Sequence, residues 1–243
     1  MARRLDWPDC ANARDLGGLP RPGGLTRTGV AVRSDCVAYL TEAGCSAMRD
    51  YGVTTVIDLR SASEVAGALD ERFPRTAADA PRPAGVTYLH RALVDDVTFD
   101  RMRGAKDMLE RYLLMLQYRQ SGFREIFESL AQADGPVLFH CMAGKDRTGL
   151  VAAMLLELAG VSRDAVAADF AETDRQLSSW YETWLGRAAP EARLAMRDDL
   201  SCPPERILAV LDHLSVRWGG VAGYLEAAGM SAAGIDRVSA RLA

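Results

Sequence analysis

The sequence predicts an α/β fold in which helices flank a central, mostly parallel β-sheet. Two observations support this class. Short apolar runs with β-branched residues are typical of strands, and most of the remaining chain carries apolar residues at helical spacing. Strands that alternate with helices commonly form such layered sheets. The 243 residues, 49% of them hydrophobic and 26% charged, suffice for a sizeable core, so we expect a single domain over residues 1–243.

Three segments are expected to form strands. Residues 53–59 (VTTVIDL) are rich in β-branched residues, residues 86–94 (VTYLHRALV) alternate in part, and residues 136–140 (PVLFH) are short and apolar. Residues 1–30 are rich in Gly, Pro and Arg and should be mostly irregular. The segment ADAPRPAG near residue 80 should be a surface loop.

Three further segments show helical periodicity, because their apolar residues recur three or four positions apart. These residues are Phe123, Ile126, Phe127 and Leu130, then Leu150, Val151, Met154, Leu155 and Leu158, and finally Ile207, Val210, Leu211 and Leu214. Gly160 should end the second helix, and Pro203 and Pro204 lie near the start of the third. RAAPEAR near residue 190 should separate two helices, and about residues 165–200 are candidates for a helical lid.

Composition excludes several classes of function. The net charge of −4 argues against a broad nucleic-acid-binding surface, which would be strongly basic. No apolar run reaches transmembrane length, and the start MARRLDWPDC is unlike a secretory signal. The five cysteines are odd in number, scattered and without a CxxC pair. We therefore expect no disulfide framework, no metal site and no cofactor, and a reducing cytoplasm as the compartment.

The segment HCMAGKDRTG at residues 140–149 carries the chemistry. A short buried strand should deliver Cys141 at its carboxyl end, a tight loop should follow, and a helix should begin near Arg147. The small residues Ala143 and Gly144 let backbone N–H groups point inward. The phosphate-binding residues are thus expected to be Met142, Ala143, Gly144, Lys145, Asp146 and Arg147.

The same loop should activate the thiol. A cysteine near a helix N-terminus and a cation can have its pKa lowered from about 8.5 to roughly 3.5–7.5. Cys141 would then be a thiolate that attacks phosphorus and forms a phosphocysteine. Arg147 would hold two phosphate oxygens with its planar fork, and Thr148 would hydrogen-bond the sulfur. His140 is expected to support the loop from the end of the strand rather than to take part in catalysis.

The motif resembles the protein tyrosine phosphatase superfamily, whose signature H-C-x5-R-[ST] is complete here. AGKDRTG, together with NARDLGG at residues 12–18 and IDLRS at residues 57–61 with Glu64, is similar to the atypical bacterial branch that includes the mycobacterial protein tyrosine phosphatase B. The resemblance implies phosphotyrosine as the leading substrate class, with dual specificity and phosphoinositides as further options. It implies a phosphotyrosine protein or a small phosphorylated molecule as partner, and inhibition by phosphate-like oxyanions.

The general acid stays open among four aspartates. Asp58 ends the first predicted strand, at the place that the bacterial branch uses, and Asp146 lies in the loop itself. Asp95 and Asp96 follow the second strand, where dual-specificity phosphatases keep their acid. Asp58 and Asp146 rank level, ahead of the other two. The alternative for Asp58 is a structural partner of Arg60 or Arg14.

Structural roles are expected for several other residues, and two other classes of function remain as alternatives. Arg14, Asp15, Gly17 and Gly18 are expected to shape a turn and an ion pair. Trp180, Tyr181 and Trp184 could form an aromatic lid, although packing against the body is favoured. Lys145 at the rim of an anion pocket would favour highly phosphorylated ligands, but Met142 stands where lipid phosphatases keep a second lysine. A catalytically idle phosphate-binding module and a rhodanese-like sulfur carrier are the alternatives from other classes.

Overall fold

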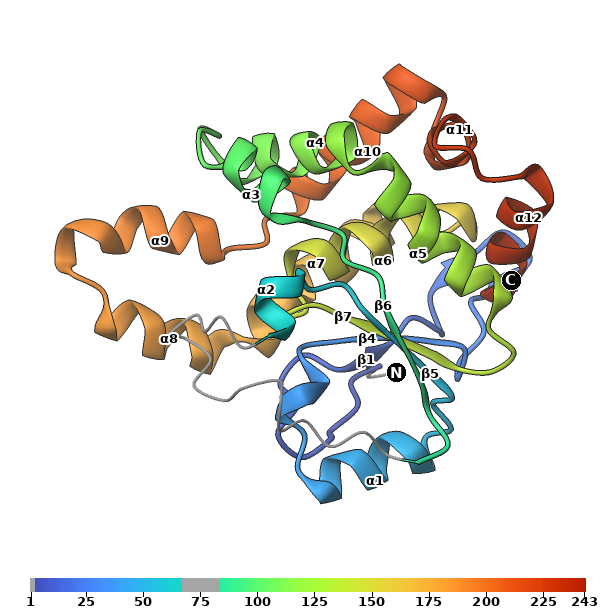
Figure 1. Ribbon diagram of the computed structural model, residues 1–243, viewed down its shortest axis with the longest axis horizontal. Helices are drawn as coiled ribbons and strands as arrows, with labels where there is room; N and C mark the ends of the chain where they lie inside the picture. Colours follow the sequence, from blue (N-terminus) through green and yellow to red (C-terminus); the bar gives the residue numbers. More distant parts are fainter. Residues whose placement is uncertain (1–2, 67–83) are drawn as a thin grey trace.

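The computed structural model describes residues 3–66 and 84–243, and it confirms an α/β fold with a mostly parallel sheet. The main sheet has five strands in the order β1-β4-β7-β5-β6 (Figure 1). Strand β1 pairs with β4 antiparallel, and the other pairs are parallel. The strands span Arg14–Asp15 (β1), Ala31–Ser34 (β4), Val137–His140 (β7), Thr55–Asp58 (β5) and Thr87–His90 (β6). Strands β2 (Pro20–Arg21) and β3 (Gly24–Leu25) form a separate pair.

The strand register brings three carboxyl ends to one edge of the sheet. His140 of β7 lies between Ser34 of β4 and Asp58 of β5. Because parallel strands end at the same edge, the segments that follow them meet there. The loop after β7 therefore starts at the centre of the sheet and is flanked by the other two segments.

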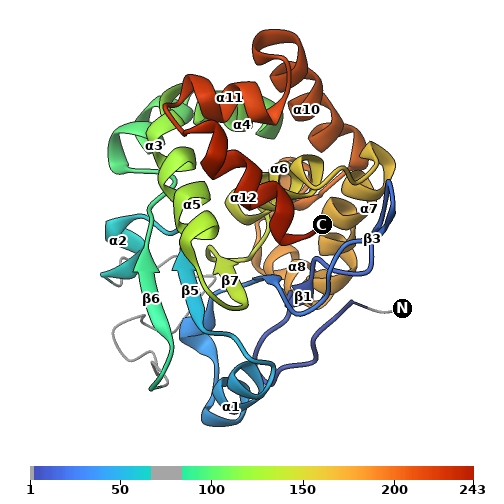
Figure 2. The same ribbon diagram turned by 90° about the vertical axis from the view of Figure 1, so that its right-hand side faces the viewer.

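Helices cover the two faces of the sheet unequally. Helix α1 lies on one side, and α5, α6, α11 and α12 lie on the other (Figures 1 and 2). The first helices span Glu42–Asp50 (α1), Ala62–Val65 (α2), Asp96–Met102 (α3), Met108–Tyr118 (α4), Gln120–Gln132 (α5) and Asp146–Leu158 (α6). The later ones span Arg163–Gln176 (α7), Ser178–Arg187 (α8), Arg193–Leu200 (α9), Pro204–Trp218 (α10), Val221–Ala227 (α11) and Ala232–Arg241 (α12).

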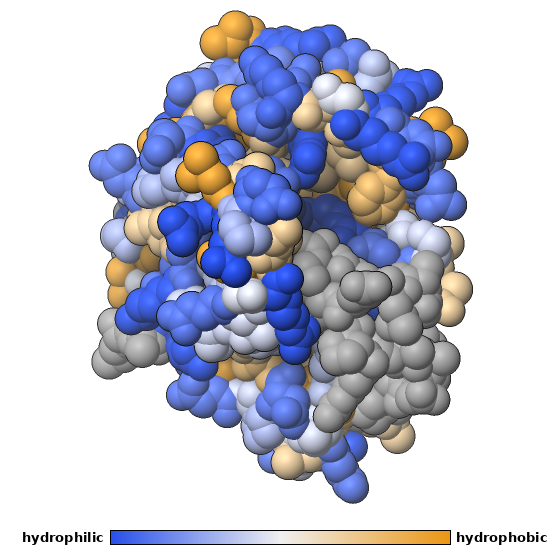
Figure 3. All heavy atoms as spheres, turned by 90° about the vertical axis from the view of Figure 1, so that its left-hand side faces the viewer, coloured by the Kyte–Doolittle hydropathy of each residue, from blue (hydrophilic) through white to orange (hydrophobic). Residues whose placement is uncertain are grey.

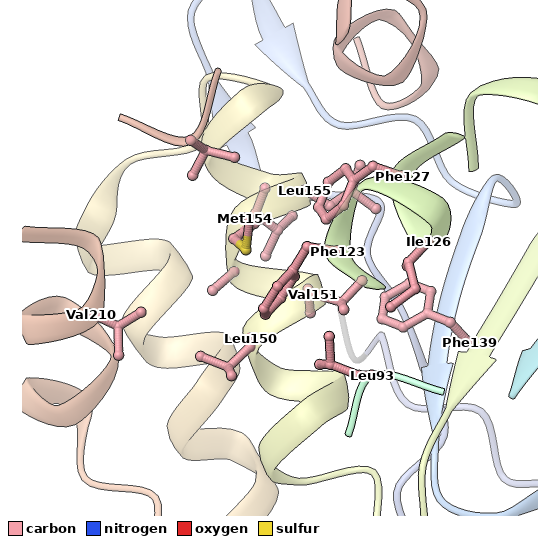
Figure 4. Close-up of a cluster of buried hydrophobic side chains, with 14 of the residues drawn as sticks. Leu93, Phe123, Ile126, Phe127, Phe139, Leu150, Val151, Met154, Leu155 and Val210 are labelled. Atoms are coloured by element: carbon pink, nitrogen blue, oxygen red, sulfur yellow. The ribbon is translucent and has the colours of Figure 1, made fainter. Parts of the chain in front are cut away.

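Alternating side chains of the central strands build two cores. Val56 and Leu138 belong to the apolar cluster on the α1 side, whereas their neighbours Ile57 and Phe139 belong to the larger cluster opposite. This follows from the period of two in a strand, which sends successive side chains to opposite faces. Figure 4 shows the larger cluster, in which Phe123 and other side chains of α5 face those of α6. Full burial of one such side chain contributes about 1.5–3 kcal/mol.

Most predicted elements are present in the structure. The three predicted strands correspond to β5, β6 and β7, and the three periodic segments to α5, α6 and α10. The break near residue 190 separates α8 from α9, as predicted. Residues 3–30 are mostly irregular but contain β1, β2 and β3, which the sequence did not predict, and β4 follows directly. The predicted loop near residue 80 lies mostly outside the described residues. No helix in the described part of the chain is long and apolar enough to cross a membrane.

Candidate active site

The predicted chemistry-bearing loop lies at the carboxyl end of the central strand. We call residues 141–147 the Cys–Arg loop. It begins with Cys141, which directly follows β7 and is 3% exposed, and it runs into the first turn of α6. Gly144 adopts a φ of +67°, and a Cβ atom there would lie 2.3 Å from the carbonyl oxygen of Ser34. Only glycine can therefore take this conformation so close to the end of β4.

Four successive carbonyl groups of the loop are hydrogen-bonded to the surrounding protein. His140 Nδ1 donates to the carbonyl oxygen of Cys141 (2.9 Å), and the backbone N–H of Cys36 donates to that of Met142 (2.9 Å). Asn12 Nδ2 donates to the carbonyl oxygens of Ala143 (2.9 Å) and Gly144 (3.1 Å). The oxygen of Gly144 accepts a second hydrogen bond, at 2.7 Å, from Nη2 of Arg33.

The N–H groups of the loop consequently face the other way. In a trans peptide the carbonyl of one residue and the N–H of the next point in opposite directions. Carbonyls that are directed into the protein at residues 141–144 therefore direct the N–H groups of residues 142–145 away from it. Within the described part of the chain, these four N–H groups donate to no protein acceptor. They form a row of free donors beside Cys141, which suits an anion.

Arg147 is anchored at one edge of its guanidinium group. Its Nη1 and Nη2 atoms pair with the two carboxylate oxygens of Glu64 at 2.5 and 2.7 Å. Glu64 is itself fixed, because it forms a capping box with Ser61 at the start of α2. A guanidinium carries five N–H donors, and only two of those of Arg147 have partners among the described residues, which leaves three that could bind a ligand. Burial lowers the pKa of Arg147, but its hydrogen bonds with the carboxylate of Glu64 outweigh this effect and raise the pKa overall.

Asp146 is held by two neighbours. The hydroxyl of Tyr112 donates to its Oδ1 at 2.5 Å, and Nζ of Lys145 lies 2.8 Å from the same oxygen. Burial raises the pKa of Asp146, but the ammonium of Lys145 and the hydroxyl of Tyr112 lower it by more. Lys145 also donates to the carbonyl oxygen of Asp199 in α9 (2.8 Å). Both predicted loop charges are thus engaged with protein partners rather than solvated.

Asp58 is the partner of Arg60, the alternative that the sequence left open. Arg60 donates to both carboxylate oxygens, with contacts of 2.6 to 3.1 Å. Burial raises the pKa of Asp58, but His140 and Arg60 lower it far more. His140 Nε2 lies 3.9 Å from Asp58, and burial lowers the pKa of His140.

The other two aspartates lie at the start of α3. Asp95 caps this helix through Thr98 and pairs with Arg119, and its hydrogen bonds to Thr98 lower its pKa. Asp96 accepts a hydrogen bond from Ser63 at 3.2 Å. Both therefore have structural partners, and none of these partners belongs to the Cys–Arg loop.

Thr148 does not make the contact that was predicted for it. Its hydroxyl oxygen is buried and makes no hydrogen bond with the residues that the structure describes. The predicted bond to the Cys141 sulfur is therefore not formed in this structure, and the role of Thr148 stays a prediction.

A cleft of about 510 Å³ adjoins the loop on the side of α3, α4 and α9. Apolar side chains dominate one part of its wall, and charged residues form the rest. The apolar lining residues are Val94, Phe99, Met102, Met108, Met115, Met196 and Leu200. The charged ones are Arg103, Arg111, Lys145, Asp146, Arg147 and Asp199. Figure 3 views the side of the molecule where α8 and α9 lie, and it shows a hollow in this face.

The aromatic residues of α8 pack close to the loop. Trp184 and Leu200 form a small buried cluster between α8 and α9. Partly buried residues pack against it, and they include Met142 and Ala143 of the Cys–Arg loop as well as Trp180 and Tyr181. In Figure 1 the two helices form a hairpin that extends from the rest of the molecule. The packing that the sequence favoured for these aromatic residues is thus present.

Some site residues were not predicted from the sequence. Asn12, Arg33 and Tyr112 contact the loop from three distant segments, and Glu64 entered the sequence analysis only through the family resemblance. NARDLGG was a signal for Asn12, but nothing local marks Tyr112 or Arg33. Within the described residues, no group of three or more His, Cys, Asp or Glu could hold a metal ion.

The chain is similar to known proteins over nearly its whole length. Residues 5–243 match the model of the tyrosine phosphatase family. A tyrosine-protein phosphatase of Nostoc commune is 32% identical over 228 residues, which cover 87% of this chain and 73% of the relative. The triple specificity protein phosphatase PtpB of Mycobacterium tuberculosis is 30% identical over 276 residues, with 96% of each chain covered. The crystal structure of P. aeruginosa TpbA has a TM-score of 0.37 and 21% identity, and the match covers 69% of this chain and 86% of that one.

Proposed function

Because the chain belongs to the tyrosine phosphatase family, we propose that it hydrolyses phosphomonoesters through a phosphocysteine intermediate on Cys141. One observation carries the proposal. Within the described residues, four N–H groups of the Cys–Arg loop and three donors of Arg147 have no protein acceptor, and they all belong to the loop that begins with Cys141. Such a set of fixed donors suits the oxygens of a phosphoryl group, whose charge it would stabilise in the transition state.

The first step transfers the phosphoryl group to the enzyme. The Cys141 thiolate attacks phosphorus opposite the leaving oxygen, the S–P bond forms, and the P–O ester bond breaks. The loop N–H groups and Arg147 hold the three equatorial oxygens. The leaving phenolate or alkoxide takes a proton from a general acid, which contributes about 10²–10⁴-fold to the rate.

Asp146 is our choice for the general acid. It lines the cleft beside Arg147, whereas Asp58 is bound along both carboxylate oxygens by Arg60. The neighbours of Asp146 lower its pKa, but a phosphate dianion bound next to it would raise that pKa through like-charge repulsion. Tyr112 would then keep the protonated carboxyl group in place.

The second step returns the enzyme to its starting state. A water molecule attacks phosphorus, Asp146 accepts one of its protons, and the S–P bond breaks. Inorganic phosphate leaves, and the Cys141 thiolate is regenerated. Thr148 is placed at the start of α6 and could stabilise the departing thiolate through its buried hydroxyl.

Phosphotyrosine is the proposed leading substrate. The apolar part of the cleft, with Phe99 and several methionines, can pack against an aromatic ring whose phosphate lies in the loop. Dual specificity is an extension of this proposal, since the relative PtpB carries the description triple specificity. Phosphate-like oxyanions should compete with the substrate for the loop.

A phosphoinositide is the second candidate substrate. Arg103 and Arg111 lie in the same cleft as Lys145, and further phosphates of an inositol ring could bind them. Phosphate release from phosphotyrosine peptides and from phosphoinositides would separate the two candidates.

Turnover of p-nitrophenyl phosphate tests the proposed reaction. Cys141→Ser should reduce kcat by about 10⁴-fold or more, because the remaining hydroxyl is a far poorer nucleophile. Cys45→Ser, which changes a buried cysteine of α1, is the matched control and should keep its activity. A wild-type protein that binds phosphate without hydrolysing esters would support the idle binding module, and thiosulfate turnover alone would support the sulfur carrier.

Two further parts of the proposal concern architecture and compartment. We propose a single phosphatase domain in which α8 and α9 act as a helical lid over the Cys–Arg loop, supported by the cluster of Trp184 and Leu200 beside Met142 and Ala143. The cytoplasm stays the compartment that the odd, scattered cysteines predict.

A further inference from the structure

A buried cluster of charged side chains lies behind the Cys–Arg loop, on the side away from the proposed substrate. Its centre is Asp169 of α7, whose side chain is 1% exposed. Asp169 Oδ1 pairs with Arg3 (2.6 Å) and with Nε of Arg14 (3.1 Å), and its Oδ2 pairs with Nη1 of Arg33 (2.8 Å). The side chains of Arg14 and Arg33 are at most 1% exposed. Two fully buried cations thus share one carboxylate.

Both buried arginines connect Asp169 to the carbonyl groups of the loop. Arg33 holds Asp169 with one nitrogen and the carbonyl oxygen of Gly144 with the other. Arg14 donates to Oδ1 of Asn12, and this bond orients the amide of Asn12 so that its Nδ2 donates to Ala143 and Gly144. The chain of contacts therefore runs from α7 to the two peptide groups at the centre of the loop.

This arrangement is costly if its only purpose is stability. Burial and the neighbouring charge of Arg33 lower the pKa of Arg14 to about 10, so two like charges are kept close together away from water. Apolar residues of similar size often stabilise a core equally well or better. Apolar residues could not, however, hold two carbonyl oxygens in a fixed direction.

We propose that Asp169, Arg33, Arg14 and Asn12 are positioning residues for phosphoryl transfer. They direct the carbonyls of Ala143 and Gly144 into the protein, and they thereby direct the N–H groups of Gly144 and Lys145 toward the substrate. None of the four needs to touch the substrate. The inference rests on the proposed function, in which those N–H groups bind the transferred phosphoryl group.

The test compares Arg33→Met with a matched control, Arg241→Met. Arg241 also holds two backbone carbonyls, those of Ala133 (2.5 Å) and Gly135 (2.6 Å), but these lie before the amino end of β7. Both variants lose a guanidinium that holds backbone carbonyls, and both should be less stable than the wild type in urea unfolding. Only Arg33→Met changes the direction of the loop N–H groups.

Binding of tungstate, a phosphate-like oxyanion, is the deciding measurement, by calorimetry and by competitive inhibition. In Arg33→Met we expect a Kd about 10–100-fold higher, the loss that misdirected charge-assisted hydrogen bonds produce. The acidic limb of the kcat/KM profile should move to higher pH, because fewer donors face the thiolate. Arg241→Met should match the wild type in both measurements. Arg33→Lys, which can reach one acceptor but not both, should fall between the two.

Each possible result of the tungstate experiment either supports or overturns the inference. If Arg33→Met does not fold, Asn12→Ala removes the donors to the same carbonyls and should raise the Kd in the same way. Equal tungstate affinities in Arg33→Met, or in Asn12→Ala, and in Arg241→Met would overturn the inference while leaving the proposed function intact. A wild-type protein that binds no tungstate would overturn the proposed function and this inference with it.

Discussion

The present contacts of Asp146 and its proposed role require different protonation states of its carboxyl group. Its carboxylate accepts hydrogen bonds from Tyr112 and Lys145, which favour the ionised form, whereas a general acid must carry a proton. A bound phosphate dianion would change this balance, because it adds negative charge next to the carboxylate. The proton would then be available only when a substrate occupies the loop.

Asp146→Asn should therefore affect esters according to their leaving group. With phenyl phosphate, whose phenolate is a poor leaving group, we expect kcat to fall by about 10²–10⁴-fold. With p-nitrophenyl phosphate the loss should be much smaller, since that leaving group departs without a proton. Steady-state kinetics with the two esters measures the ratio. Equal losses on both would remove Asp146 from the role, and the same comparison on Asp58→Asn would then test the other candidate.

Single residues also show what could be predicted from the sequence. Cys141 and Arg147 are six positions apart, and their spacing alone places them at the two ends of one loop. The partners of Asp146 and Arg147 were harder to find. Tyr112 and Glu64 reach the loop from other elements, and no local pattern at residue 112 distinguishes a hydrogen-bonding tyrosine from a core tyrosine.

At the scale of elements, the turn from β7 into α6 depends on close contact with β4. Gly144 combines a left-handed backbone with a position directly against the carbonyl of Ser34. Neither condition tolerates a side chain. The loop and the end of β4 are therefore one structural unit, although more than a hundred residues separate them in the sequence.

Gly144→Ala should destabilise the protein and impair catalysis together. The left-handed conformation alone costs an alanine about 1–2 kcal/mol, and the clash with Ser34 adds to this by displacing the loop. Urea unfolding and kcat/KM would measure both effects. Gly186→Ala is the control, because Gly186 lies in α8 with no atom near its Cβ position, and alanine there should stabilise by up to about 1 kcal/mol. Unchanged kcat/KM in Gly144→Ala would contradict the close contact.

Strands β1 to β4 were not predicted from the sequence, and there are two physical reasons for this. Strands β1, β2 and β3 have two residues each, too few to show alternation. Strand β4 contains Arg33 and Ser34, which are fully buried despite their polarity because they lie beside the loop. Strands β5 and β7 instead carry apolar residues on both faces, and that pattern was visible in the sequence.

At the scale of the whole molecule, ionised carboxylates that are paired with arginines link stability to pH. The pKa values of Asp58, Glu64 and Asp169 are all lowered, since nearby cations outweigh the effect of burial. A carboxylate with a lowered pKa contributes stability that is complete above its unfolded pKa, and this contribution is lost as the pH falls toward the folded value. The protein should therefore lose stability in acid.

Asp58→Asn removes one of these carboxylates and should make the free energy of unfolding less dependent on pH in acid. Between about pH 5 and pH 3 the free energy of unfolding should fall less steeply in this variant than in the wild type, because the unfolded pKa of aspartate is about 3.9. Urea titrations across this range measure the slope. Asp236→Asn, at an exposed position, should follow the wild-type curve. Parallel curves for Asp58→Asn and the wild type would show that the pair with Arg60 adds no pH-dependent stability.

The fold class could be predicted from the sequence, but the long-range contacts could not. Alternation of strands and helices is a local signal, and it predicted the layered architecture. The contacts of Asn12 with Gly144 and of Arg14 with Asp169 join segments more than 130 residues apart. NARDLGG indicated a turn and an ion pair, and both exist, but the identity of the partner required the structure.

The position of Asp169 has a consequence for biosynthesis. The ribosome makes Asn12, Arg14 and Arg33 early and the Cys–Arg loop much later, and the carboxylate that holds both arginines follows the loop by more than twenty residues. A nascent chain that ends just after HCMAGKDRTG would carry every residue of the signature yet lack the group that aligns its supports. If the proposed positioning role is correct, the signature segment reaches its final conformation only after α7, which is translated later, has docked.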